Sequence, residues 1–121
     1  MTHHAAHIRA FSESADFDFE IRSALGASVE GAAEPGEVLA AVAGIRNGEH
    51  EAWFDAWKGL ADRTVATASA SAEAGHPVSA ASAYLRASAY YGVAVNAASA
   101  LADPDAMAPT FAKQEAAWRG F

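Results

Sequence analysis

Alanine dominates this chain and restricts what it can fold into. It supplies 34 of the 121 residues and more than half of the 52% counted as hydrophobic. Alanine favours the α-helix because it loses no side-chain rotamer entropy when the helix forms. The β-branched residues that favour strands are few, at seven valines, three isoleucines and four threonines. We therefore predict an all-α domain whose helices approach one another through small side chains.

The length of the chain and its helix breakers predict one bundle of about five helices, joined as helical hairpins. Residues 1–16 show no sustained hydrophobic period and are expected to form a loose N-terminal arm, while residues 17–121 form the single domain. Glycine and proline mark the breaks, most clearly at Gly75-His76-Pro77 and Asp103-Pro104-Asp105. The expected helices cover residues 17–29, 35–45, 49–74, 79–100 and 105–118.

Apolar residues recur every three or four positions in the expected helices and identify the faces that should form the core. The face of the first helix consists of Phe17, Ile21, Leu25 and Val29. The face of the second helix consists of Val38, Leu39, Val42 and Ile45. The third helix carries the bulkiest set, which consists of Trp53, Trp57, Leu60 and Thr64, flanked by Phe54 and Ala61. The expected N-caps of the first and fourth helices are Asp16 and Ser79.

The charge balance and the missing residue types argue against several classes of partner. With 8 basic and 15 acidic residues the net charge is −7, which opposes binding to nucleic acid or to an anionic membrane. The chain contains no cysteine, so it offers no disulfide, thiolate nucleophile or cysteine zinc site. No stretch is long and apolar enough to span a bilayer, and the N-terminus lacks the apolar core of a secretory signal. We expect a cytoplasmic protein without a cofactor.

No complete catalytic or metal-binding pattern is found in the sequence. The nearest match to the Gly-x-Ser-x-Gly nucleophile turn surrounds Ser28, but it has one residue too many and lies in a helical pattern. Three histidines of the arm have a spacing that can place a metal on one helix face, namely His3, His4 and His7. No acidic residue precedes Glu13 to complete such a site. We therefore predict neither catalytic residues nor a metal site.

Residues 82–91 form an unusual segment for an alanine-rich helix. Tyr84, Ser88 and Tyr91 fall on one stripe of the helix, and Arg86 and Tyr90 fall on another. Tyrosine combines an apolar ring with a polar tip and suits a surface that is buried but partly wet, and arginine can stack on such rings. The structural alternative is an amphipathic core helix in which Arg86 extends to solvent or forms a salt bridge with another helix.

Three segments together carry a resemblance to a known family. They are residues 48–57, which contain a Trp-x-x-x-Trp pattern, residues 75–80, and residues 83–91, which contain Tyr-Leu-Arg-Ala-Ser-x-Tyr-Tyr. The chain resembles, over residues 17–121, the N-terminal helical cap of serine α/β-hydrolases similar to the fermentation-respiration switch protein and to 2,6-dihydroxypseudooxynicotine hydrolase. In such proteins the catalytic serine, aspartate and histidine belong to a domain that would follow Phe121, so the resemblance assigns no catalytic residue here.

The resemblance implies a partner, a role and a set of candidate residues. The expected partner is an α/β-hydrolase catalytic domain, in the same gene or in a separate chain. The expected role is to roof the pocket, exclude water and select the ester, amide or carbon–carbon bond that is hydrolysed. The candidates for substrate-pocket or interface residues are Tyr84, Arg86, Tyr90, Tyr91, Trp53 and Trp57.

Two other functions stay open on the residues alone. The chain is either a stand-alone interaction module without enzymatic activity, forming a homo-oligomer through its alanine and serine faces, or a bundle that binds a small ligand between Trp53, Trp57 and the tyrosines. The cap hypothesis differs from both in one expectation. It requires an apolar face that is left exposed where the catalytic domain would sit.

Overall fold

The computed structural model describes residues 11–121, which contain helices and no strand. In chain order the helices are α1 (Ala15–Gly26), the 3₁₀-helix η2 (Ala27–Glu30), α2 (Pro35–Val42), α3 (His50–Glu73), α4 (Pro77–Ala98) and α5 (Met107–Gly120). The prediction of an all-α bundle of about five helices is confirmed. The first ten residues of the predicted arm, which include His3, His4 and His7, lie outside the described residues.

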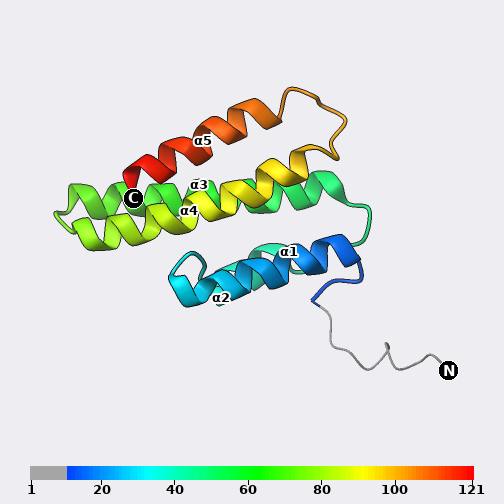
Figure 1. The fold of residues 1–121 in the computed structure, drawn as a ribbon, viewed down its shortest axis with the longest axis horizontal. Helices are drawn as coiled ribbons and strands as arrows, with labels where there is room; N and C mark the ends of the chain where they lie inside the picture. The colour runs from blue at the N-terminus through cyan, green and yellow to red at the C-terminus, as the bar shows by residue number, and fades with distance from the viewer. Residues whose placement is uncertain (1–10) are drawn as a thin grey trace.

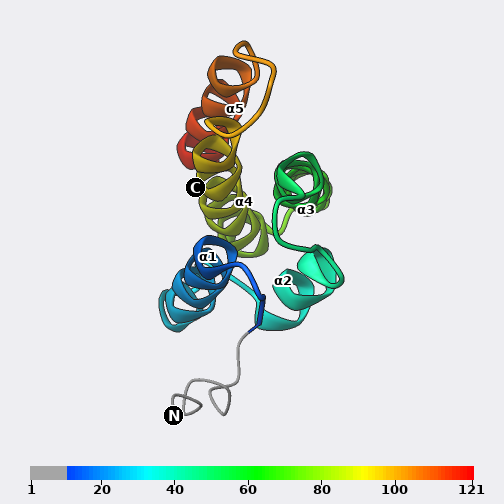
Figure 2. The ribbon, with the colours of Figure 1, turned by 90° about the vertical axis from the view of Figure 1, so that its right-hand side faces the viewer.

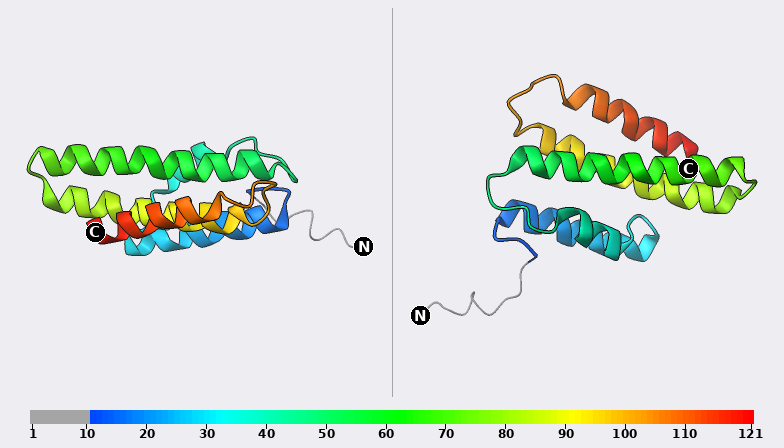
Figure 3. Two further views of the ribbon diagram at one scale, coloured as in Figure 1. Left: turned by 90° about the horizontal axis from the view of Figure 1, so that it is seen from above. Right: turned by 180° about the vertical axis from the view of Figure 1, so that it is seen from behind.

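The helices form two rows around the long α3–α4 hairpin. Figure 1 shows α3 and α4 side by side, with α5 along one side of the hairpin and α1 and α2 along the other. Seen from the end in Figure 2, α5, α4 and α1 lie in one row, and α3 and α2 lie in the second. Figure 3 shows that the α3–α4 turn projects beyond the other helices. Helix α4 contacts α1, α3 and α5 and is therefore the central element of the fold.

The core consists of large side chains from α1, α2 and α3 packed against α4. Trp57, Tyr90 and Ile21 are among the largest side chains that are almost completely buried. Phe17 stacks on Trp53 with ring centroids 4.1 Å apart, and Trp53 meets Trp57 edge-on at 5.5 Å. Burying an apolar side chain of this size contributes about 1.5–3 kcal/mol. The stripe predicted in the third helix is therefore the centre of the core.

The first helix differs from its prediction at both ends. Its N-cap is Ser14 and not Asp16, because the Ser14 hydroxyl accepts a hydrogen bond from the Phe17 amide at 3.2 Å. Asp16 lies instead in the first turn, where its charge favours the helix dipole. Phe17 and Ile21 are buried as predicted, but Val29 is 89% exposed. The chain tightens into η2 before Val29, and three residues per turn rotate that side chain away from the core face.

The second helix is shorter than predicted. It ends at Val42, and Gly44, two residues later, has a φ of 79°. This left-handed conformation cannot be part of a right-handed helix. Val38 and Val42 are buried as expected, whereas Leu39 is 37% exposed.

The turn between α3 and α4 shows why Ser79 is not the N-cap of α4. Gly75 has a φ of 81°, and the amides of Gly75 and His76 donate to the carbonyls of Ala72 and Ser71, which ends α3 in a Schellman motif. Pro77 then begins α4, where its fixed φ suits the first helical position. Ser79 consequently lies inside the first turn.

Candidate functional site

Arg86 and Tyr90 meet two acidic residues of α2 and its N-cap. The Tyr90 hydroxyl donates to Glu37 Oε1 at 3.0 Å and accepts from the Glu34 amide at 2.9 Å. Arg86 Nε donates to the same Glu37 oxygen at 3.1 Å, and Arg86 also contacts the Ser82 hydroxyl at 3.3 Å. This is the interhelix salt bridge considered above as the structural alternative for Arg86.

The electrostatics of this junction favour a fixed, protonated Tyr90. Burial raises the pKa of the Tyr90 hydroxyl, and the neighbouring Glu37 carboxylate raises it further. The Glu34 carboxylate caps α2 by accepting from the amides of Gly36 at 3.2 Å and Glu37 at 2.9 Å. Because every one of these groups is paired, the junction holds α2 against α4 and does not present a reactive group.

Tyr91 forms a second junction, between α3, α4 and α5. Its hydroxyl donates to Asp62, whose carboxylate also pairs with Lys58 at 3.0 Å and with Lys113 of α5 at 3.2 Å. Partial burial opposes ionisation of Asp62, but the hydrogen bonds from the hydroxyl and the two ammonium groups outweigh it and lower the pKa of the carboxyl. Burial and the Asp62 hydrogen bond raise the pKa of Tyr91. Three helices are therefore tied together at one carboxylate.

Tyr84 lies against the last turn of α5. A Cβ built on Gly120 would meet atoms of the Tyr84 ring at 2.8 Å, so only glycine allows this approach. Farther along the same helix pair, a Cβ on Gly92 would meet Gln114 Nε2 at 2.9 Å. Gly120 therefore allows α4 and α5 to pack closely, as the abundance of small residues predicts, whereas the end of the flexible Gln114 side chain could move away from a Cβ at position 92.

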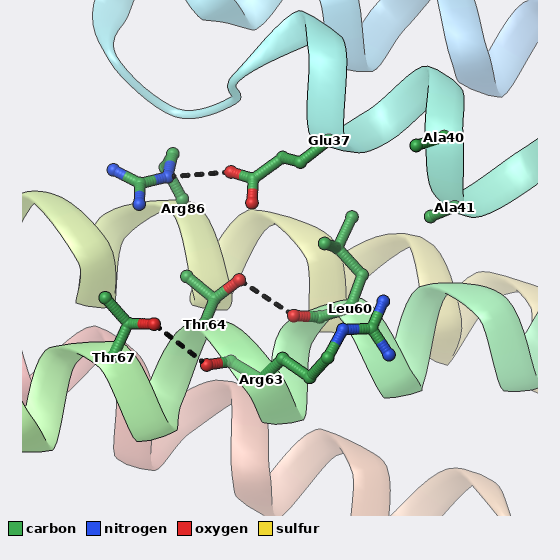
Figure 4. A pocket seen from close by; sticks show the side chains of 8 residues that line it. All are labelled: Glu37, Ala40, Ala41, Leu60, Arg63, Thr64, Thr67 and Arg86. Carbon is green, nitrogen blue, oxygen red and sulfur yellow. Dashed lines mark hydrogen bonds and ion pairs between the residues drawn. The ribbon is translucent and has the colours of Figure 1, made fainter.

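An open groove of about 290 Å³ lies between α2, α3 and α4. Figure 4 shows it, with Arg86 and the guanidinium of Arg63 at opposite sides. The hydroxyls of Thr64 and Thr67 are engaged within α3, since they donate to the Leu60 carbonyl at 2.7 Å and the Arg63 carbonyl at 3.3 Å. The guanidinium of Arg63 makes no hydrogen bond or ion pair within residues 11–121. This groove is polar and contains no nucleophile beside a base.

The described residues contain no other arrangement suited to catalysis. Ser28 lies in η2, where its hydroxyl donates to the Leu25 carbonyl at 2.6 Å, so the near-match to a nucleophile turn is helical as predicted. Between residues 11 and 121 there is no cluster of three histidine or acidic side chains able to hold a metal. No helix of that range is long and apolar enough to cross a membrane.

The six candidate residues do not converge on one pocket. Trp53, Trp57, Tyr90 and Tyr91 are at most 3% exposed and belong to the core. Tyr84 and Arg86 are partly exposed, and they line different grooves. Their polar partners, Glu37 and Asp62, were not predicted, because sequence spacing does not show which helices pack together.

Helix α5 carries an apolar face that the sequence reasoning missed. Met107, Phe111, Trp118 and Phe121 are between 40% and 58% exposed. The rings of Trp118 and Phe121 contact each other, with centroids 5.4 Å apart. The sequence spacing itself indicates this face, since four positions separate Met107 from Phe111 and seven separate Phe111 from Trp118, which places all three on one side of the helix.

Comparison with known proteins finds α/β-hydrolases. Alpha/beta hydrolase xenA of Xenoacremonium sinensis and alpha/beta hydrolase gkaG of Penicillium citrinum are each 42% identical to this chain over 81 residues, and alpha/beta hydrolase pydG of an Acremonium species is 41% identical over 83. The matches cover 67% to 69% of this chain but only 19% to 20% of each relative, so the chain spans about a fifth of their length. No family model matches the chain, and no solved structure matches it. The chain is therefore similar to one segment of larger α/β-hydrolases.

Proposed function

We propose that this chain is a helical cap domain of a serine α/β-hydrolase, and that the catalytic residues lie in the part of such an enzyme that the chain does not match. The observation that carries the proposal is the similarity to three α/β-hydrolases over only a fifth of their length. The closed hydrogen-bond networks around Glu37 and Asp62 support it, because they suit a rigid scaffold and not a reactive centre. A cytoplasmic location remains part of the proposal on the sequence features given above.

A rigid helical cap can affect catalysis by shaping the pocket below it and by excluding water from that pocket. Closing a site removes water and strengthens the electrostatic interactions that stabilise the transition state. Of the six candidate residues, Tyr84 and Arg86 are the two that retain exposed surface for contact with a substrate or with the catalytic domain. Trp53, Trp57, Tyr90 and Tyr91 would act by holding the helices in place. The substrate class is an ester, amide or carbon–carbon bond open to attack by the catalytic serine.

A chimera tests the proposal. This chain replaces the matched segment of the xenA hydrolase, and hydrolysis of p-nitrophenyl butyrate is compared among the parent enzyme, the chimera and a variant that lacks the segment. We expect the chimera to recover a large part of the kcat/KM that the deletion variant loses, and the isolated chain to show no hydrolysis. The proposal is contradicted if the chimera is no better than the deletion variant while circular dichroism shows its α/β domain to be folded.

One observation favours a second candidate, a homodimerisation module without activity. The exposed apolar side chains of α5 would also fit a second copy of the chain. Sedimentation equilibrium across a dilution series separates the two candidates. A mass that doubles with concentration favours the dimer, and a constant monomer mass favours the cap.

A further inference from the structure

The outer face of the α1–α4–α5 row combines exposed aromatic side chains with two shallow grooves. Among the described residues, four of the exposed large apolar side chains lie on α5 or directly after it, namely Met107, Phe111, Trp118 and Phe121. Figure 2 shows that α5, α4 and α1 lie in one row, so the side of α4 that faces away from α3 lies between its two neighbours. All three helices can therefore contribute side chains to this face.

The two grooves of this face meet at Phe111 and Gln114. One groove, of about 400 Å³, runs between α1, α4 and α5, and the other, of about 260 Å³, runs between α4 and α5. Both are lined by Phe111 and Gln114. From α4, the larger groove is lined by Ala89 and Gly92 together with Tyr90, Val93, Val95 and Asn96, and the smaller groove is lined by Ser88. The surface therefore has hollows beside Phe111 and Trp118 that can receive protruding side chains.

The composition of the face is that of a protein interface. Aromatic residues and methionine are enriched at the centres of protein interfaces, and charged residues form their rims. Phe111 and Trp118 line these grooves together with the charged Glu20, Glu115 and Arg119. The α2–α3–α4 groove is different, because the Arg86–Glu37 ion pair and Arg63 make it polar.

We propose that the outer α1–α4–α5 face, with Phe111 and Trp118 at its centre, is the surface on which the catalytic part of the α/β-hydrolase packs, an inference that rests on the proposed function. The occupant follows from the relatives, in which about four fifths of the chain lies outside the matched segment. That remainder is covalently joined to the helical segment, so its effective concentration is on the order of millimolar and a modest apolar face suffices for stable contact. A second copy of the chain has no such advantage.

Hydroxyl-radical footprinting of the xenA chimera tests this assignment. The isolated chain and the chimera are oxidised in parallel, and the rates at Met107, Phe111 and Trp118 are compared with those at Leu39 and Val78 on other surfaces. We expect a several-fold slower oxidation of the α5 side chains in the chimera and unchanged rates at the two reference residues. In the isolated chain the oxidation rate of each of these five side chains should not change with protein concentration.

Matched variants give a second readout. Phe111→Ser and Trp118→Ser should each lower the thermal midpoint of the chimera by roughly 2 °C or more, because they remove apolar contact at the centre of the interface. In the isolated chain the same variants should behave like Val78→Ser, which also replaces an exposed apolar side chain by serine, at a position that is 82% exposed.

The outcomes separate this inference from the proposed function. Protection of the α2–α3–α4 groove in place of α5, in an active chimera, overturns the assignment of the face and leaves the cap function standing. Protection of the α5 residues in the isolated chain that grows with its concentration assigns the face to a second copy and overturns the inference. An inactive chimera in which no side chain is protected from oxidation would contradict both this inference and the proposed function.

Discussion

The Tyr90 hydroxyl offers the sharpest test of how α2 is held to the bundle. Tyr90→Phe removes two hydrogen bonds, one to the Glu37 carboxylate at 3.0 Å and one from the Glu34 amide at 2.9 Å. The ring itself, which lies 6.1 Å from the Trp57 ring between centroids, keeps its packing. The substitution therefore isolates the polar contribution of the junction.

The size of the effect follows from the partners. A hydrogen bond to a charged group contributes about 1.5–3 kcal/mol to stability, and a neutral one about 0.5–1.5 kcal/mol. Glu34 is exposed and Glu37 keeps its contact with Arg86, so both former partners are partly satisfied in the variant. We therefore expect a loss at the lower end of the summed range, about 2 kcal/mol. For a domain of this size that loss lowers the melting temperature by roughly 8 °C.

Urea unfolding of the isolated chain, followed by far-UV circular dichroism, measures this loss. The matched control is Tyr84→Phe, since the Tyr84 hydroxyl makes no hydrogen bond within residues 11–121. The control should stay within about 0.5 kcal/mol of the wild type. Equal losses in the two variants would refute the reasoning, because the hydrogen bonds of Tyr90 would then contribute nothing.

Three further perturbations test other parts of the structure. Gly120→Ala should destabilise the domain by about 1–2 kcal/mol, because the new Cβ would meet the Tyr84 ring at 2.8 Å. Gly26→Ala places its Cβ in open space, with no atom within 4 Å, and should stabilise the domain by about 0.4–1 kcal/mol. Unfolding midpoints of the two variants that shift in the same direction would contradict the close α4–α5 contact. The lowered pKa of Asp62 contributes stability that is present above its ordinary value of 3.8 and is lost as the pH falls through the folded-state pKa. The difference in unfolding free energy between wild type and Asp62→Asn should therefore be largest at neutral pH and should shrink as the pH falls into the acid range. A difference that does not change with pH would argue against the ion network. The raised pKa of Tyr91 contributes stability that is complete below 10.0 and is lost as the pH rises above it, so Tyr91→Phe should flatten the alkaline limb of the stability profile, which thermal unfolding from pH 8 to 11 measures.

Periodicity identified the part of the fold that rests on local geometry. The stripe that contains Trp53 and Trp57 is buried because a long regular helix keeps its apolar face in register over many turns. The same reasoning failed at Val29, where a change from α- to 3₁₀-helix alters the rotation per residue. It failed at Ser79 because Pro77 is itself a good first helical residue, and two adjacent start signals cannot be ranked from sequence alone.

The candidate site was harder to predict from the sequence, because its contacts join distant parts of the chain. Arg86 was singled out, but its partner Glu37 lies 49 positions earlier, on a short helix whose packing against α4 depends on the whole bundle. The link from Tyr91 to Asp62 has the same origin. The apolar face of α5 lay within the expected last helix, but the exposure of Phe111 and Trp118 is a property of the packed bundle and not of their spacing.

The most direct test of the cap function is to restore a hydrolase by adding the cap in trans. The xenA variant that lacks the matched segment is titrated with the isolated 121-residue chain, and kcat/KM for p-nitrophenyl butyrate is measured at each concentration. A cap domain predicts a saturable rise in kcat/KM that is weakened by Phe111→Ser and Trp118→Ser but not by Val78→Ser. A kcat/KM that stays constant up to chain concentrations on the order of millimolar, with the variant enzyme folded, would contradict the cap function.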